Sequence, residues 1–193
     1  MIRPLAIILG AFALAGPASA SILIYTGAFS GANESPPSGS LGTGFTTVTI
    51  DTTLFTMRTE ANFTGLGTGT TAAHIHIRPD SQTANGGVAT QLPSFVNFPL
   101  GVTSGTYDQT FDMTLASSWN PTYVTNNGGT TASAFSAFVS SLNSGLGYFN
   151  IHTTGFPGGE IRANLAPVPE PATILVLSLG AAALVRRRKR TAK

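Results

Sequence analysis

The feature that most constrains the fold is a succession of short segments in which apolar and polar residues alternate, separated by turns rich in Gly, Pro, Asn and Thr. Alternation with period two is typical of β-strands, because successive side chains point to opposite faces of a sheet. The uninterrupted segments are 22–29, 45–50, 54–63, 72–78, 105–115, 148–153 and 160–165, and prolines break two further runs, 88–92 and 95–100. Short strands with frequent turns predict an all-β fold, an antiparallel sandwich of the immunoglobulin-like kind.

One segment has a different period. Apolar residues between Phe135 and Leu142 follow the spacing i, i+3, i+4, i+7, which is typical of one face of a helix. Thr130 or Thr131 can cap its start, and Gly145 is placed to end it. The sequence therefore predicts one short helix over 131–143. Its apolar stripe is expected to pack on the sheet, and partner binding is the alternative.

Charge and cysteine content exclude several classes of function. Charged residues make up 9% of the chain, and region 22–165 has three arginines against seven acidic residues, a net charge of −4. This acidic balance argues against nucleic-acid binding. The chain has no cysteine, so disulfides and thiolate chemistry are excluded.

Residues 1–20 have the pattern of a secretory signal peptide. A positive charge at Arg3 precedes an apolar run, and the segment ends in the small residues of Ala-Ser-Ala. We expect signal peptidase to cleave between Ala20 and Ser21. The alternative is a buried N-terminal helix, which Pro17 disfavours.

The C-terminal end has three parts. A linker, 166–171, contains the motif Val168, Pro169, Glu170 and Pro171; residues 172–185 carry no charge; and a basic tail, 186–193, follows. A helix of fourteen residues rises about 21 Å, short of the roughly 30 Å hydrocarbon core, so we expect a short transmembrane helix that spans only marginally. The tail begins with a stop signal that stays cytoplasmic, formed by Arg186, Arg187, Arg188, Lys189 and Arg190.

This arrangement resembles a PEP-CTERM sorting signal. The resemblance implies recognition, and cleavage near Pro-Glu-Pro, by an exosortase of Gram-negative bacteria that make exopolysaccharide. A plain C-terminal anchor is the alternative. The protein would then pass through the inner membrane before it reaches the envelope or the outside of the cell.

Region 21–165 resembles a CHRD domain, a module named after chordin. The matching motifs are FSGANESPP at 29–37, AAHIH at 72–76, and NIHT and PGGEIR within 150–162. The resemblance implies an immunoglobulin-like or superoxide-dismutase-like β-sandwich and brings no catalytic activity with it. Segment 80–123 is longer and more irregular than the usual middle of the family.

The three histidines are candidate metal ligands. His74 and His76 lie two residues apart and share one face of a predicted strand, and His152 lies in the strand 148–153. If these strands are neighbours, three imidazoles can bind one zinc or copper ion. Glu160 or Glu34 can supply an oxygen or orient a ligand. The alternative is structural histidines that only form hydrogen bonds.

Two further expectations concern chemistry. A dinuclear site of the copper–zinc superoxide dismutase type requires more histidines than the three present and is excluded. We expect Arg162 to pair with Glu34 or another carboxylate, with ligand contact as the alternative.

The main functional prediction is a non-catalytic binding or structural module of the bacterial surface or exopolysaccharide matrix, with no cofactor. The weakly charged surface, rich in Ser, Thr, Asn and Gly, suits contact with hydrated glycans or glycosylation of the protein itself. The alternative is a zinc- or copper-binding protein, or a metal-dependent enzyme, that uses His74, His76 and His152.

Overall fold

The computed structural model describes residues 22–80 and 84–169. Its strands form one antiparallel sheet in the order β5-β4-β7-β8-β1-β2-β3-β6, and β9 pairs with β1. The strands are β1 (Ile22–Ser30), β2 (Thr43–Asp51), β3 (Thr56–Thr64), β4 (Thr70–Ile77), β5 (Gly87–Val88), β6 (Gly105–Asp112), β7 (Gly147–Thr153), β8 (Ile161–Asn164) and β9 (Ala166–Pro167).

The predicted all-β antiparallel class is confirmed. Each uninterrupted segment of the sequence corresponds to an observed strand, whereas run 88–92 contributes only the two residues of β5 and run 95–100 forms no strand. The immunoglobulin-like or superoxide-dismutase-like sandwich remains a prediction, because the strands follow one continuous hydrogen-bonded path.

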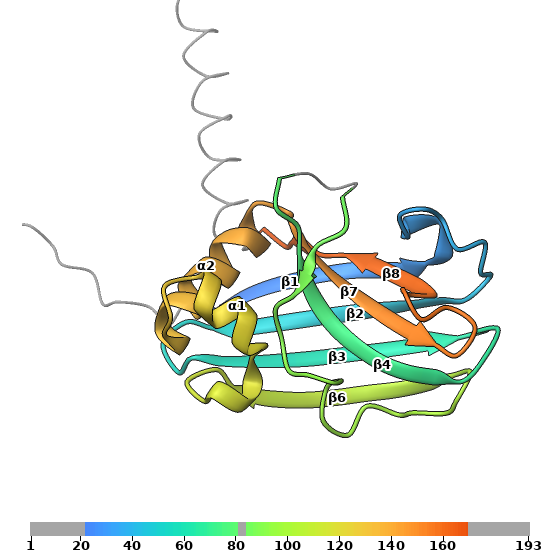
Figure 1. Cartoon of the computed structure of the whole chain (residues 1–193), viewed down its shortest axis with the longest axis horizontal. Helices are drawn as coiled ribbons and strands as arrows, with labels where there is room; N and C mark the ends of the chain where they lie inside the picture. The colour runs from blue at the N-terminus through green and yellow to red at the C-terminus, as the bar shows by residue number, and fades with distance from the viewer. Residues whose placement is uncertain (1–21, 81–83, 170–193) are drawn as a thin grey trace, which may run out of the picture.

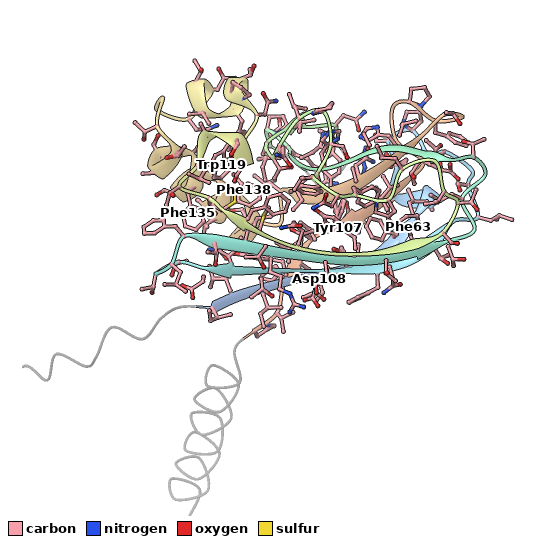
Figure 2. The ribbon with its side chains drawn as sticks, turned by 90° about the horizontal axis from the view of Figure 1, so that it is seen from below. Phe63, Tyr107, Asp108, Trp119, Phe135 and Phe138 are labelled. Atoms are coloured by element: carbon pink, nitrogen blue, oxygen red, sulfur yellow. The ribbon has the colours of Figure 1, made fainter. Side chains whose placement is uncertain are left out.

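The sheet curls, so that β4 and β7 cross in front of β1, β2 and β3 (Figure 1). The space enclosed by the curl is filled with aromatic and aliphatic side chains. Phe149 of β7 packs against Phe29 of β1 and against Phe95 of the loop after β5, with ring centroids 5.2 and 5.4 Å apart. Figure 2 shows Tyr107 turned towards this core and Asp108 turned away from it, as the alternation along β6 requires.

Two helices lie together at one end of the sheet (Figure 1). Helix α2 (Thr131–Asn143) has the predicted bounds and begins with a capping box between Thr130 and Ser133. The prediction of a single α-helix is wrong, because α1 (Pro121–Asn126) precedes it. Helix α1 has six residues and buries none of them, so it produces no apolar periodicity. Two short 3-10 turns, Gly31–Asn33 and Ala116–Ser118, complete the elements of the described ranges.

The predicted terminal segments fall largely outside the described residues. This applies to the signal peptide 1–20 with its cleavage site at Ala20 and Ser21, and to everything from Glu170 onwards. The predicted linker starts differently, since Ala166–Pro167 form β9 and the backbone N–H of Val168 donates to the carbonyl oxygen of Ile24 at 2.8 Å. Within 22–80 and 84–169, no helix has the length and apolar character needed to cross a membrane.

Candidate metal centre

Three neighbouring strands, β4, β7 and β8, carry polar side chains on the face turned away from the core. In the strand register, one row across the three strands is formed by His74, Asn150 and Arg162. Two residues further along the strands, the next row on the same face is formed by His76, Tyr148 and Asn164. The alternate residues of these strands are apolar and buried in the core: Ala73, Ile75, Phe149, Ile151, Ile161 and Ala163. The polar face and the apolar core are therefore two sides of the same short strands.

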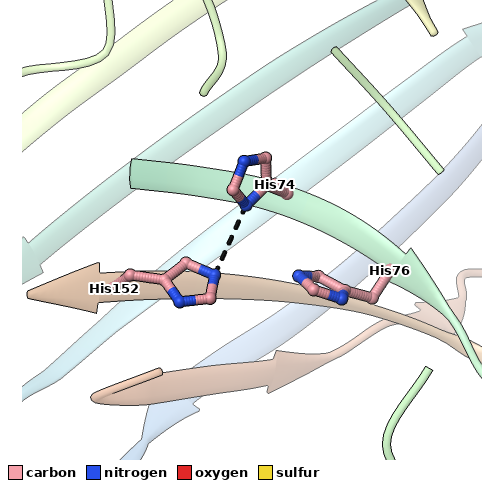
Figure 3. Close-up of side chains that lie close together, drawn as sticks. All are labelled: His74, His76 and His152. Atoms are coloured by element: carbon pink, nitrogen blue, oxygen red, sulfur yellow. Dashed lines mark hydrogen bonds between the residues drawn. The ribbon is translucent and has the colours of Figure 1, made fainter. Parts of the chain in front are cut away.

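The structure brings the three histidines together on this polar face (Figure 3). His152 lies opposite Ala72, beside His74, and one ring nitrogen from each histidine lies within 4.8 Å of the others. Nδ1 of His74 and Nε2 of His152 are 3.3 Å apart. His74 and His76 are only 5% and 8% exposed, so these nitrogens are shielded from bulk water.

Backbone carbonyl groups determine which ring nitrogen of each histidine carries the proton. Nε2 of His74 lies 2.6 Å from the oxygen of Pro93, Nδ1 of His76 lies 3.0 Å from that of Gly86, and Nδ1 of His152 lies 2.8 Å from that of Pro157. A carbonyl oxygen only accepts, so each of these nitrogens must donate. In each neutral ring the other nitrogen is therefore unprotonated and carries a lone pair.

Two of these lone pairs face each other, and the third is buried without a partner. Nε2 of His76 is buried and has no hydrogen-bond partner, and Nδ1 of His74 faces Nε2 of His152. Two lone pairs at 3.3 Å do not form a hydrogen bond and repel each other unless a cation lies between them. A proton or a metal ion between the two nitrogens would remove this repulsion.

A proton fits this pocket poorly. Burial lowers the pKa of His74 to about 4 and that of His76 to about 3, although the hydrogen bonds to Pro93 and Gly86 oppose the shift. Burial also lowers the pKa of His152, and the positive charge of Arg162 lowers it further. All three rings are neutral at pH 7, which is the form that binds metal ions.

Glu160, the fourth predicted ligand, does not lie in this group. Its Oε1 accepts hydrogen bonds from Ser40 and from the backbone of Gly67 at 2.7 and 2.6 Å, and its Oε2 accepts one from Thr153 at 2.6 Å. Burial alone raises the pKa of Glu160, but these hydrogen bonds together lower it. The carboxylate thus joins two loops to β7, and its role as a metal ligand remains a prediction.

The predicted pairing of Arg162 with Glu34 is confirmed. Nη2 and Nε of Arg162 lie 2.8 and 3.0 Å from Oε2 of Glu34, and both side chains are almost completely buried. Burial raises the pKa of Glu34, and Arg162 and Asn150 oppose this shift. Nδ2 of Asn150 donates to Oε1 of Glu34. A chain of contacts therefore runs from Arg162 through Glu34 to Asn150, which faces His74 across the strands.

Sequence reasoning missed Asn150 and Tyr148 as parts of this site. The ring of Tyr148 stacks on His76 with centroids 4.8 Å apart, and the guanidinium of Arg162 lies 4.0 Å from its centre. The signal that could have found both residues is the period of two that leads back from His152 along one strand.

Glycine is required next to this chain of contacts. Gly159 has a φ of +127°, and a Cβ there would lie 2.5 Å from Nδ2 of Asn150 and 2.8 Å from Oε1 of Glu34. Any side chain at this position would displace the contact between Glu34 and Asn150.

Comparison with known proteins identifies two family models that match the chain. The family model described as CHRD domain matches residues 25–165, and the one described as PEP-CTERM protein-sorting motif matches residues 167–190. Searches of curated proteins and of solved structures found no match. The sorting motif implies an exported, membrane-processed protein that is a substrate of an exosortase. With the domain model covering most of its length, the chain belongs to the CHRD domain family and carries a PEP-CTERM protein-sorting motif behind that domain.

Proposed function

We propose that this exported CHRD protein binds one zinc or copper ion through Nδ1 of His74, Nε2 of His76 and Nε2 of His152. The observation that carries the proposal is that one ring nitrogen from each histidine lies within 4.8 Å of the others, while backbone carbonyl groups hold the opposite nitrogens of the rings as donors. Each ring is held by a hydrogen bond from its other nitrogen, which is the arrangement that fixes metal-ligating histidines.

The distances fit one small ion. Two nitrogens bound at about 2.0–2.1 Å to a tetrahedral ion lie about 3.3 Å apart. The separation of His74 Nδ1 and His152 Nε2 is 3.3 Å, so this pair has the required spacing. The nitrogen of His76 lies within 4.8 Å of the other two, so this ring must move closer to reach the spacing of a tetrahedral site.

The chemistry of the donors favours zinc or copper. Neutral imidazoles suit these ions, whereas calcium and magnesium require oxygen ligands. A tetrahedral ion has four ligand positions, and the three histidines of this group occupy three of them. The group supplies no residue for the fourth position. Such a position is open to water or to an external molecule, which is compatible with a metal carrier and with metal-assisted chemistry.

A role in surface binding is the second candidate, and a different part of the molecule favours it. A shallow cavity of about 300 Å³ lies on the outer face of β2, β3 and β6, and among its lining residues are Phe45, Glu60, Asn62 and Thr106. Phe45 is 45% exposed. An exposed aromatic ring beside hydroxyl, amide and carboxylate groups suits a sugar, in agreement with the predicted contact with exopolysaccharide.

The metal proposal is tested by equilibrium dialysis of the full chain against zinc and copper, with metal content measured per chain. His74→Gln, His76→Asn and His152→Asn keep an amide N–H near the nitrogen that donates to the backbone but remove the ligating imidazole. We expect one ion per chain in the wild type and an affinity loss of more than about 100-fold in each variant.

Glu160→Gln is the matched control, because Glu160 is a buried polar residue that lies outside the histidine group. It should retain one ion per chain. Wild-type protein without stoichiometric metal, or variants that retain the wild-type affinity while folded, would overturn the proposal.

A further inference from the structure

Glu34 determines the orientation of the Asn150 amide. Oε2 of Glu34 accepts a hydrogen bond from Nε of Arg162 and lies 2.8 Å from Nη2, and this pairing with a guanidinium favours the ionised carboxylate. An ionised carboxylate only accepts, so the group of Asn150 that meets Oε1 of Glu34 must be its NH₂. The carbonyl oxygen of the amide, Oδ1, must then point away from Glu34.

The strand register places Asn150 directly opposite His74, and its Oδ1, the end of the amide that Glu34 does not engage, lies beside Gly159, where a Cβ would be 2.6 Å from it. Asn150 lies between Arg162 on β8 and His74 on β4 in the strand register, and its NH₂ group is engaged on the Glu34 and Arg162 side. Oδ1 is buried and has no hydrogen-bond partner. Nε2 of His76, on the same polar face, is also a buried acceptor without a donor. A metal ion would satisfy the histidine, and a hydrogen-bond donor bound to that ion would satisfy Asn150.

We propose that Asn150 selects the molecule that occupies the fourth position of the metal. This inference rests on the proposed metal site. Oδ1 accepts a hydrogen bond from a ligand that carries an O–H group, such as water or the hydroxyl of a sugar or other alcohol. A proton-free anion at the same position would place a lone pair against the amide oxygen, and leaving a buried acceptor unpaired is costly. The site therefore favours hydroxyl compounds over simple anions.

The experiment uses the full chain loaded with Co²⁺, whose visible absorption reports its ligands, and titrates it with thiocyanate. We expect weak thiocyanate binding in the wild type and at least about tenfold tighter binding in Asn150→Ala, which lacks the acceptor; tenfold corresponds to about 1.4 kcal/mol. Asn150→Ser is the second variant. Its hydroxyl keeps one hydrogen-bond donor at this position if alanine prevents folding, while the amide oxygen is lost.

Asn164→Ala is the matched control. Asn164 is an amide on the same face but lies opposite Tyr148 and accepts from Arg78, so thiocyanate affinity should stay within about twofold of wild type. Unchanged affinity in both Asn150 variants would overturn the inference while leaving the metal site standing. A changed cobalt spectrum before thiocyanate is added would also overturn it, because Asn150 would then be a direct ligand. Wild-type protein that takes up no stoichiometric cobalt would overturn this inference and the proposed function together.

Discussion

Acid should destabilise the metal-free protein through its buried histidines. In the unfolded chain a histidine has a pKa of about 6.5. In the folded chain burial lowers the pKa of His74 to about 4 and of His76 to about 3. Between these values the unfolded state binds more protons than the folded state, so stability falls as the pH falls below about 6.5 and stops falling below the folded pKa values.

The size of the effect follows from these values. A pH of 5 is about 1.5 units below the unfolded pKa, and each unit changes the free energy of unfolding by about 1.4 kcal/mol. Moving from pH 7.5 to pH 5 therefore lowers the free energy of unfolding by about 2 kcal/mol for each of the two histidines. The combined loss of about 4 kcal/mol is a large share of the stability of an ordinary domain. The lowered pKa of His152 adds to the loss in the same direction.

Urea denaturation of the metal-free protein at several pH values measures this loss. Carboxylates also titrate near pH 5, so the double variant His74→Gln/His76→Asn is the control, since it keeps every acidic group. Its stability should change about 4 kcal/mol less than that of the wild type between pH 7.5 and pH 5. Equal changes in the two proteins would refute the reasoning, because the histidines would then not be buried and neutral in solution.

Two further predictions concern the contacts around Glu34. Gly159→Ala should lower the free energy of unfolding by about 2–4 kcal/mol, because of the positive φ at this position and the clash of a Cβ with Asn150. Gly158→Ala is the control, since a Cβ there meets no atom, and it should change the free energy of unfolding by less than about 0.5 kcal/mol. Equal effects of the two variants in urea denaturation would contradict this. Glu34→Leu and Arg162→Met should each cost about 3–5 kcal/mol because one buried charge remains, and the double variant should cost less than the sum. A double-mutant cycle with additive costs would show that the two side chains do not interact.

Local patterns explain why much of the sheet could be predicted. Alternation identified the strands, and it placed His74 and His76 on one face because that relation depends only on a spacing of two residues within one strand. The spacing of apolar residues in 131–143 gave the correct bounds of α2 because a helix of thirteen residues is long enough to show its period.

Non-local contacts explain what the sequence did not reveal. Phe95 and Phe98 enter the core from an irregular loop that contains Pro93 and Pro99, so neither residue belongs to a periodic pattern. Nor can spacing reveal that Glu160 is fully engaged by Ser40 and by Gly67, which lie about a hundred residues away in the chain. The sequence therefore could not show these contacts of Glu160.

The histidine rings are anchored by the main chain at Pro93, Gly86 and Pro157. Every amino acid has a backbone carbonyl oxygen, so the residues of these three loops can be replaced during evolution without removing the hydrogen bonds to the histidines. Insertions and deletions are different, since a shifted loop would carry its carbonyl away from the ring. Among related proteins with the same three histidines, loop length should therefore vary less than loop sequence at these positions.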